Sequence, residues 1–155
     1  MISFKSLTRQ TEIGANCYLL KIGNKRILID AGMHPKEEGK KSLPDFSSIY
    51  EHDLDAAILS HAHLDHSGSM PIVQRHYPEM PVMMTEATST LSQALLHNSV
   101  NVMTSKRNEL GLDEYPFFTH REIHKISKRW YHRRTEKKFE LDNDGEIECT
   151  FYDAG

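Results

Sequence analysis

The sequence predicts a layered α/β fold built on a mixed β-sheet. Two short apolar segments, RILID (26–30) and AAILS (56–60), have the length and composition of buried strands. Helix signals then alternate with strand signals, and a hairpin pattern follows towards the end of the chain. This order of elements begins with strands, continues with alternating strands and helices, and ends with a hairpin. It favours helices packed on a sheet that has both parallel and antiparallel neighbouring strands. The 155 residues fit one domain.

Segments rich in branched, aromatic and apolar residues predict the strands. A tight turn at Gly23-Asn24 separates two of them near the N-terminus. Asn143-Asp144-Gly145, placed between two apolar segments, is typical of a β-hairpin. The expected strands are residues 2–6, 15–21, 26–30, 56–60, 81–84, 137–141 and 147–152.

Two helices are expected in the first half of the chain. Residues 45–52 favour one short helix, and residues 31–44, which contain Gly and Pro, favour a loop. Ser67 is placed to cap a helix that runs to about Tyr77, and Pro71 is tolerated in its first turn.

Two further helices are expected in the second half. Thr85 is placed to cap a helix from Glu86 to about Val100. Its expected buried face consists of Ala87, Leu91, Ala94 and Leu95, which recur at helical spacing. Thr119, with Glu122 three residues later, predicts a capping box. That helix is expected to carry Ile123, Ile126 and Trp130 on one side, and residues 101–117 give no clear signal.

The composition excludes several classes of protein. A charged fraction of 26% argues against wholesale disorder. No apolar run approaches the roughly 18 residues that span a bilayer, and the start MISFKSLTRQ has no secretory apolar segment. Cys17 and Cys149 are too few for a disulfide scaffold, and we expect both to be free thiols in strands. These observations indicate a cytoplasmic protein without membrane association.

The charges are distributed unevenly. The net charge is −3, but residues 121–138 carry eight basic and two acidic residues. Basic residues mixed with aromatic ones are used on nucleic-acid surfaces, so Lys128, Arg129, Arg133 and Arg134 are possible RNA contacts. The alternative is a solvated helix face with Trp130 packed inward, which is the more frequent explanation of such a stretch.

The segment SHAHLDHSG (60–68) gives the strongest functional signal. It places three imidazoles and a carboxylate within six residues, directly after a predicted buried strand. Imidazole and carboxylate ligands suit zinc, and also iron or manganese. His61 and His63 alternate in an extended segment and are expected to bind one ion, whereas Asp65 and His66 are expected to reach a second. Two such ions, about 3.5–4 Å apart, can clamp an in-line displacement.

HAHLDH resembles the H-x-H-x-D-H signature of the metallo-β-lactamase superfamily. ILIDAG resembles that superfamily's first motif, and the resemblance implies that Asp30 supports the metal loop instead of binding metal. The wider text GANCYLLKIGNKRILIDAGMHP, LDAAILSHAHLDHSGSMP and PVMMTEAT looks like the β-CASP branch, whose members are mostly RNA-processing nucleases. The implied fold is a partial metallo-β-lactamase-type αββα sandwich with a mixed sheet.

The sequence also departs from the family pattern. A later motif of the superfamily supplies a third histidine to the first ion, commonly after D-A-G, and this sequence ends at Asp153-Ala154-Gly155. The later bridging acid and the β-CASP domain have no counterpart here either. We therefore expect residues 1–155 to be the N-terminal part of a longer enzyme. An incomplete ligand set for two zinc ions predicts that this part is inactive alone.

The resulting functional hypothesis is an RNA-processing nuclease in which Asp65 also orients the attacking group. A homo-oligomer formed through the full-length parent is a further expectation. The alternatives are a glyoxalase-type thioesterase or lactonase and a non-catalytic binding module. Other histidines give weaker signals. His34 could line the site. His120 and His124, one helical turn apart, lack the H-E-x-x-H order of a zincin helix and are expected to be surface residues.

Overall fold

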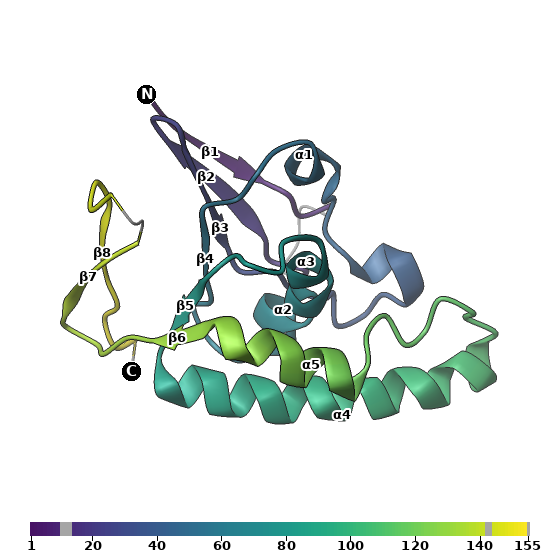
Figure 1. Cartoon of the computed structure of the whole chain (residues 1–155). Helices are drawn as coiled ribbons and strands as arrows, with labels where there is room; N and C mark the ends of the chain where they lie inside the picture. The colour runs from purple at the N-terminus through teal and green to yellow at the C-terminus, as the bar shows by residue number, and fades with distance from the viewer. Residues whose placement is uncertain (10–13, 142–143, 155) are drawn as a thin grey trace.

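The computed structural model describes residues 1–9, 14–141 and 144–154. Its centre is a six-stranded mixed sheet in the order β1-β2-β3-β4-β5-β6, and a two-stranded hairpin, β7-β8, stands apart from it. The larger helices cover one face of the sheet and the hairpin lies on the other side (Figure 1). The predicted mixed α/β architecture is therefore confirmed.

The strands lie close to their predicted positions. Antiparallel pairing joins β1 to β2 and β2 to β3, and parallel pairing joins β3, β4, β5 and β6. The hairpin strands β7 and β8 pair antiparallel, as the sequence predicted, although Asn143 of the expected turn lies outside the described residues. The strand bounds are β1 Ile2–Ser6, β2 Tyr18–Ile22, β3 Lys25–Ile29, β4 Ala56–Ile58, β5 Val82–Met84, β6 Trp130–His132, β7 Lys138–Glu140 and β8 Glu148–Thr150.

Side-chain alternation divides the sheet into two apolar faces. Leu28, Ala57 and Val82 belong to the large core under the helices. Ile27, Ala56 and Met83 belong to a smaller cluster that includes Leu141 and packs against Phe139 and Phe151 near the hairpin. The hairpin covers this second face only in part, since Ile2 and Phe4 of β1 remain 72% and 61% exposed.

The helices and 3-10 turns fill the connections between strands. In the described part of the chain, no helix is both long and apolar enough to cross a membrane. Their bounds are η1 Gly39–Ser42, α1 Ser47–Tyr50, α2 Leu64–Ser67, α3 Met70–His76, α4 Glu86–Leu110, α5 His120–Ile126 and η2 Ser127–Arg129.

The predicted helix start at Ser67 is wrong. Ser67 ends the single turn α2, and its hydroxyl donates to the Ala62 carbonyl 2.8 Å away. The next helix, α3, begins at Met70 after Ser69, with Pro71 in its first turn as expected. Residues 61–66 form a loop that runs into the separate helical turn α2, and α3 begins only after that turn.

The predicted buried face of α4 is also wrong. Thr85 caps the helix as expected, but α4 continues to Leu110 and ends at Gly111 in the left-handed conformation. Leu91 is 57% exposed. Four of the residues on the buried face carry small hydroxyl side chains. The buried residues are Thr88, Ser89, Ser92, Leu96, Ser99, Val100 and Met103. Small side chains allow close packing, and a helix carbonyl can satisfy a buried hydroxyl, as Leu96 does for Ser99 at 2.9 Å.

The capping box at Thr119 is confirmed, but the helix after it is shorter than expected. It ends at Ile126, and Trp130 begins strand β6, which pairs with β5. Trp130 packs inward, and its indole N–H donates to Gln74 Oε1 at 2.8 Å. The basic stretch therefore runs through a helix, a turn and a strand and does not form one helix face.

Candidate metal centre

The loop of residues 61–66, here called the metal loop, follows β4 and is fixed by backbone hydrogen bonds to the segment after β3. The amide of Ala31 donates to the His66 carbonyl, and that of Met33 donates to the Leu64 carbonyl, both at 2.8 Å. The amide of Asn16 donates to the Asp65 carbonyl at 2.8 Å. Because β3 and β4 are parallel neighbours, the polar segments after both strands meet at one sheet edge.

Gly32 makes this contact possible. A Cβ built on Gly32 would lie 1.7 Å from the Asp65 carbonyl oxygen. No side chain fits at that distance, so only glycine allows the backbone after β3 to approach the metal loop this closely.

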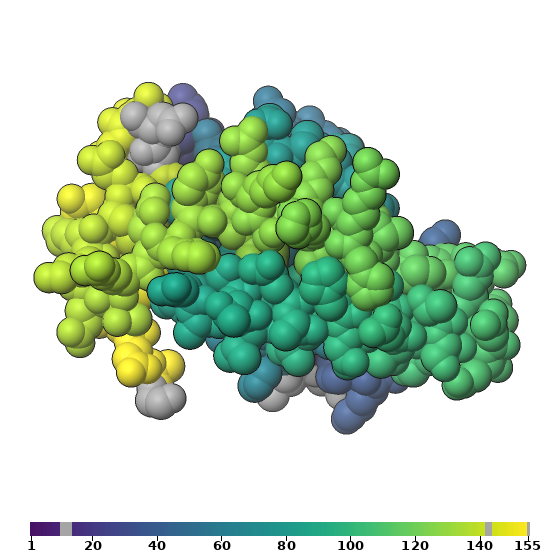
Figure 2. Space-filling model, turned by 60° about the horizontal axis from the view of Figure 1, so that its bottom comes forward, coloured from purple at the N-terminus to yellow at the C-terminus, as the bar shows by residue number. Residues whose placement is uncertain are grey.

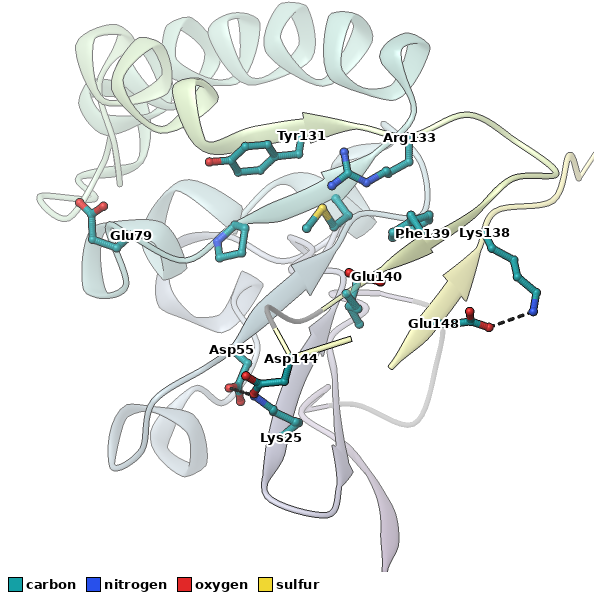
Figure 3. A pocket seen from close by; sticks show the side chains of 13 residues that line it. Lys25, Asp55, Glu79, Tyr131, Arg133, Lys138, Phe139, Glu140, Asp144 and Glu148 are labelled. Atoms are coloured by element: carbon teal, nitrogen blue, oxygen red, sulfur yellow. Dashed lines mark hydrogen bonds and ion pairs between the residues drawn. The ribbon is translucent and has the colours of Figure 1, made fainter. Parts of the chain in front are cut away.

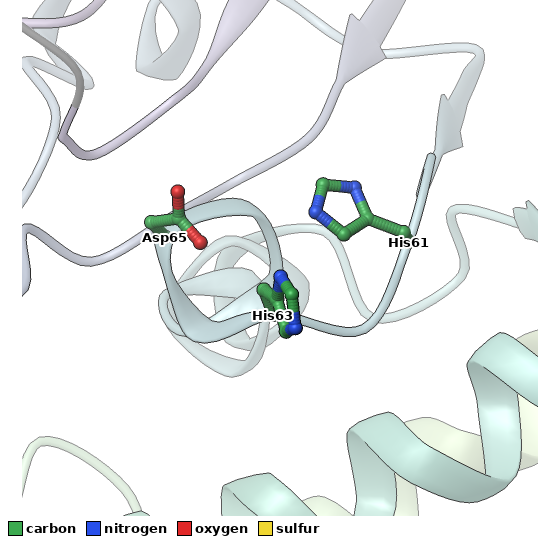
Figure 4. A group of neighbouring side chains, drawn as sticks. All are labelled: His61, His63 and Asp65. Carbon is green, nitrogen blue, oxygen red and sulfur yellow. The ribbon is translucent and has the colours of Figure 1, made fainter. Parts of the chain in front are cut away.

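Three of the predicted ligands converge. One ligand atom each from His61, His63 and Asp65 lies within 4.8 Å of the other two. Figure 4 shows the His61 ring directed across the loop towards Asp65, with His63 beside them. Two ligands on one zinc ion, each about 2.0–2.1 Å from it, can be up to about 4.2 Å apart. The donor set and its spacing therefore fit a divalent metal ion with small side-chain movements.

The fourth predicted ligand, His66, is oriented by Asp30. The Nδ1 atom of His66 lies 2.7 Å from Asp30 Oδ2, and its Nε2 atom lies 3.6 Å from Asp65 Oδ2. A proton on Nδ1, held by the carboxylate, leaves the Nε2 lone pair facing Asp65. His66 and Asp65 are thus arranged as a pair, while Asp65 also belongs to the group with His61 and His63.

Asp30 is 3% exposed and makes further bonds to the strand end of β4. Its Oδ1 accepts from the Ser60 amide and its Oδ2 from the Ser60 hydroxyl, both at 2.7 Å. Its backbone has a φ of 58°, in the left-handed region. This uncommon conformation for a residue other than glycine turns the carboxylate from the end of β3 towards the metal loop.

Asn16 is a site residue that the sequence analysis missed. Its side-chain amide donates to the Asp65 carbonyl at 3.2 Å and lies 3.1 Å from His66 Nε2. Tyr18 in turn donates to Asn16 Oδ1 at 3.2 Å. The expected strand 15–21 begins only at Tyr18, because the backbone of Asn16 pairs with the metal loop and with Gly32. A polar Asn inside an otherwise apolar segment was the available signal.

The histidines of the loop have opposite pKa shifts. Burial lowers the pKa of His61, and the nearby His66 and His63 lower it further, against the carboxylates of Asp30 and Asp65. Burial acts in the same direction on His66, but the hydrogen bond and charge of Asp30, with the charge of Asp65, raise its pKa overall. The lowered pKa of His61 favours the neutral imidazole that a metal ion needs, whereas the raised pKa of His66 favours a proton that competes with metal binding.

A groove of about 430 Å³ opens beside the metal loop. His63 and Asp65 are among the residues that line it, and so is His34, which is 3% exposed. Apolar side chains of α4 and the loop after β3 form much of the remaining wall: Met33, Leu95, Val102 and Met103. The groove therefore combines an apolar wall with the metal-binding side chains.

The predicted RNA contacts lie elsewhere. Arg129 forms an ion pair with Glu79, and the guanidinium of Arg133 lies 5.4 Å from the centre of the Phe139 ring. Arg133 lines a second cleft of about 910 Å³ between the sheet and the hairpin (Figure 3). Lys128 and Arg134 are exposed. None of these four cations is among the residues that line the groove beside the metal loop.

Comparison with known proteins identifies relatives of this chain. Residues 11–121 match the model of the metallo-beta-lactamase superfamily. Integrator complex subunit 11 from Danio rerio is 30% identical over 146 residues, which cover 90% of this chain and 24% of that protein. Endoribonuclease YSH1 from Saccharomyces cerevisiae is 32% identical over 123 residues, which cover 77% of this chain and 16% of that protein. The chain thus spans no more than about a quarter of these curated relatives.

A solved structure supports the same fold. An archaeal metallo-beta-lactamase superfamily protein from Sulfolobus tokodaii superposes with a TM-score of 0.53 at 19% identity, covering 92% of this chain and 53% of the other. The resemblance to the β-CASP branch is confirmed by the similarity to Integrator subunit 11 and YSH1. The metal loop, the Asp30 strand end and the matched family model together show that this chain belongs to the metallo-β-lactamase superfamily.

Proposed function

We propose that the full-length protein is a metal-dependent hydrolase that cleaves RNA phosphodiester bonds. The convergence of His61, His63 and Asp65 at the sheet edge is the observation that carries this proposal. The endoribonuclease among the relatives supports RNA as the substrate. Residues 1–155 would form the N-terminal part of that enzyme, and both free cysteines are consistent with the reducing cytoplasm.

His61, His63, Asp65 and His66 would hold two divalent ions, for which zinc is the proposed identity because the donors are imidazoles and a carboxylate. When bound, such ions supply positive charge that stabilises a phosphorane-like transition state. Asp65 is the proposed catalytic residue, and its carboxylate would accept a hydrogen bond from the attacking water and orient it. Asp30 acts through His66 and Ser60 by holding the metal loop in place.

The groove beside the metal loop is the proposed place for the nucleotide next to the scissile bond. Its apolar side chains would contact a base or ribose, while His63 and Asp65, which also line it, would lie near the phosphate. Among the four predicted cations, Lys128 and Arg134 are the better placed for a phosphate of a longer RNA, since Arg129 already pairs with Glu79.

The decisive assay is cleavage of a labelled single-stranded RNA by the purified full-length protein, with and without a chelator. We expect chelation to abolish cleavage and His63→Ala or Asp65→Asn to lower the rate at least about 100-fold. His52→Ala is the matched control, because His52 is exposed in the turn after α1 and should leave the rate unchanged.

A thioester substrate is assayed in parallel, since an apolar groove could also receive an acyl group. Thioester hydrolysis without RNA cleavage would replace the nuclease proposal with a glyoxalase-type activity. RNA cleavage that survives both substitutions would show that the metal loop is not the active centre.

A further inference from the structure

Ser60 lies between the buried acid Asp30 and the first histidine of the metal loop. It follows β4 at the sheet edge, directly before the metal loop begins. Its hydroxyl oxygen lies 2.7 Å from Asp30 Oδ2 and 3.1 Å from His61 Nδ1. The same Asp30 oxygen lies 2.7 Å from His66 Nδ1. One carboxylate oxygen therefore reaches two histidines, His66 directly and His61 through the Ser60 hydroxyl.

The acid fixes the direction of the hydrogen bonds in this chain of contacts. A carboxylate only accepts hydrogen bonds, so the single hydroxyl proton of Ser60 must lie between its oxygen and Asp30 Oδ2. The Ser60 oxygen is then left with lone pairs, and towards His61 it can only accept. The Nδ1 atom of His61 therefore carries a proton, and in the neutral ring Nε2 carries the lone pair.

The same tautomer follows for His66. The Ser60 hydroxyl is 3.5 Å from His66 Nδ1, so the nearer carboxylate of Asp30 is the acceptor for that proton. The rings of His61 and His66 are neighbours, with centres 3.9 Å apart. The far end of the His61 ring points across the loop towards Asp65 (Figure 4), and His66 Nε2 lies 3.6 Å from Asp65 Oδ2. Both Nε2 lone pairs thus face the side of the loop on which Asp65 lies.

We propose that Ser60 is a positioning residue of the metal centre: its hydroxyl extends the hold of Asp30 to His61, so that one buried carboxylate sets the tautomer of both histidines. The inference deepens the proposed function, since it rests on the assignment of His61 to one ion and His66 to the other. Hydrogen bonds of this kind orient a metal-binding imidazole and raise its basicity as a ligand. A single acid would here serve the histidines of both ions.

The Ser60 hydroxyl can be removed without disturbing the helical layer. α4 and α5 run side by side across one face of the molecule (Figure 2), and neither contributes to the hydrogen bonds that the structure describes for Ser60 and Asp30. Ser60 is exposed, and without its hydroxyl Asp30 would still accept from the Ser60 amide and from His66. Ser60→Ala should therefore fold and should change the tautomer of His61 alone.

The first test is histidine ¹⁵N NMR of the metal-free chain at about pH 9, well above the usual histidine pKa of about 6.5. In the wild type, both His61 and His66 should carry the proton on Nδ1. Ser60→Ala should leave His66 unchanged, whereas His61 should show both tautomers because its Nδ1 proton has lost its acceptor. Ser60→Thr keeps a hydroxyl and should restore the single tautomer of His61.

Zn²⁺ binding by the same variants, measured in competition with a chromophoric chelator, gives a second readout. Ser60→Ala should weaken binding at least about tenfold, as loss of such a partner commonly does, and Ser60→Thr should restore the wild-type affinity. The matched control is Ser67→Ala, which removes a buried hydroxyl that donates to the Ala62 carbonyl at 2.8 Å. It should lower the thermal unfolding midpoint and leave the His61 tautomer fixed.

Three results would overturn the role of Ser60. They are a wild-type His61 with its proton on Nε2, a Ser60→Ala variant that matches the wild type in tautomer and affinity, and an equal loss of the tautomer in Ser67→Ala. The tautomer is measured without metal or RNA, so this inference is separable from the nuclease proposal. A His61 tautomer that is fixed in the wild type and lost in Ser60→Ala supports it even if the full-length protein cleaves no RNA.

Discussion

At the scale of single residues, Asp30 has the most consequential position in this chain. The sequence shows it only as an acid at the end of an apolar strand. In the structure its buried carboxylate accepts from the backbone and hydroxyl of Ser60 and holds His66 at 2.7 Å. Sequence reasoning could predict the role, through the family motif, but not the partner Ser60, because nothing in the pattern ILIDAG states which side chain the acid will meet.

Asp30→Asn should therefore destabilise the fold by about 1–3 kcal/mol, since an amide cannot accept all three hydrogen bonds. The effect should also depend on pH. In the metal-free protein, the raised pKa of His66 means that its pair with Asp30 stabilises fully below the pKa of an unfolded histidine, about 6.5. This contribution is lost as the pH rises through the folded-state pKa.

Urea unfolding checks this at about pH 6 and about pH 9, and the cost of Asp30→Asn should be larger at the lower pH. Asp45→Asn is the control, because Asp45 is an exposed acid that accepts from the Ser47 amide, at 3.1 Å. An Asp30→Asn cost that is no larger than the Asp45→Asn cost at both pH values would contradict the positioning role.

At the scale of elements, the caps at Thr85 and Thr119 were predicted correctly, whereas the helix start at Ser67 and the buried face of α4 were not. Both caps, Thr85 and Thr119, depend on residues within one turn, so the sequence alone identifies them. The face that α4 buries depends on what it meets. Leu91 was predicted to be buried but is exposed. Ser92 is fully buried instead, because α4 packs closely through small side chains. Trp130 belongs to strand β6 because its backbone pairs with the edge of β5.

Thr119→Ala should lower the free energy of unfolding by about 1 kcal/mol, because it removes the acceptor for the Glu122 amide at the start of α5. Thr90→Ala is a suitable comparison. Thr90 is exposed in α4 and its hydroxyl donates within its own helix, so alanine should be neutral or slightly stabilising there. Chemical unfolding of both variants measures the difference, and equal costs would argue against the capping box.

At the scale of the whole molecule, the mixed sheet and its helical layer could be predicted, because alternating strand and helix signals suffice for that. The contact between His97 and His120, which lie 23 residues apart in sequence, could not be predicted, since it depends on how α4 and α5 pack together. The same holds for Asn16 and Asp65, which are separated by 49 residues. Long-range contacts of this kind arise from the fold and leave no local pattern.

The backbone hydrogen bonds that hold the metal loop also determine how its amide hydrogens exchange with solvent. The amides of Asn16, Ala31 and Met33 donate to carbonyls 31–49 residues away, so none can open by fraying of one local turn. Their hydrogen exchange should require separation of the β2–β3 region from the loop, and should be as slow as that of the central strand residue Leu28. Amide exchange followed by NMR would show this. Fast exchange at Ala31 and Met33, beside a protected Leu28, would mean that the loop opens independently and that the site is assembled only transiently.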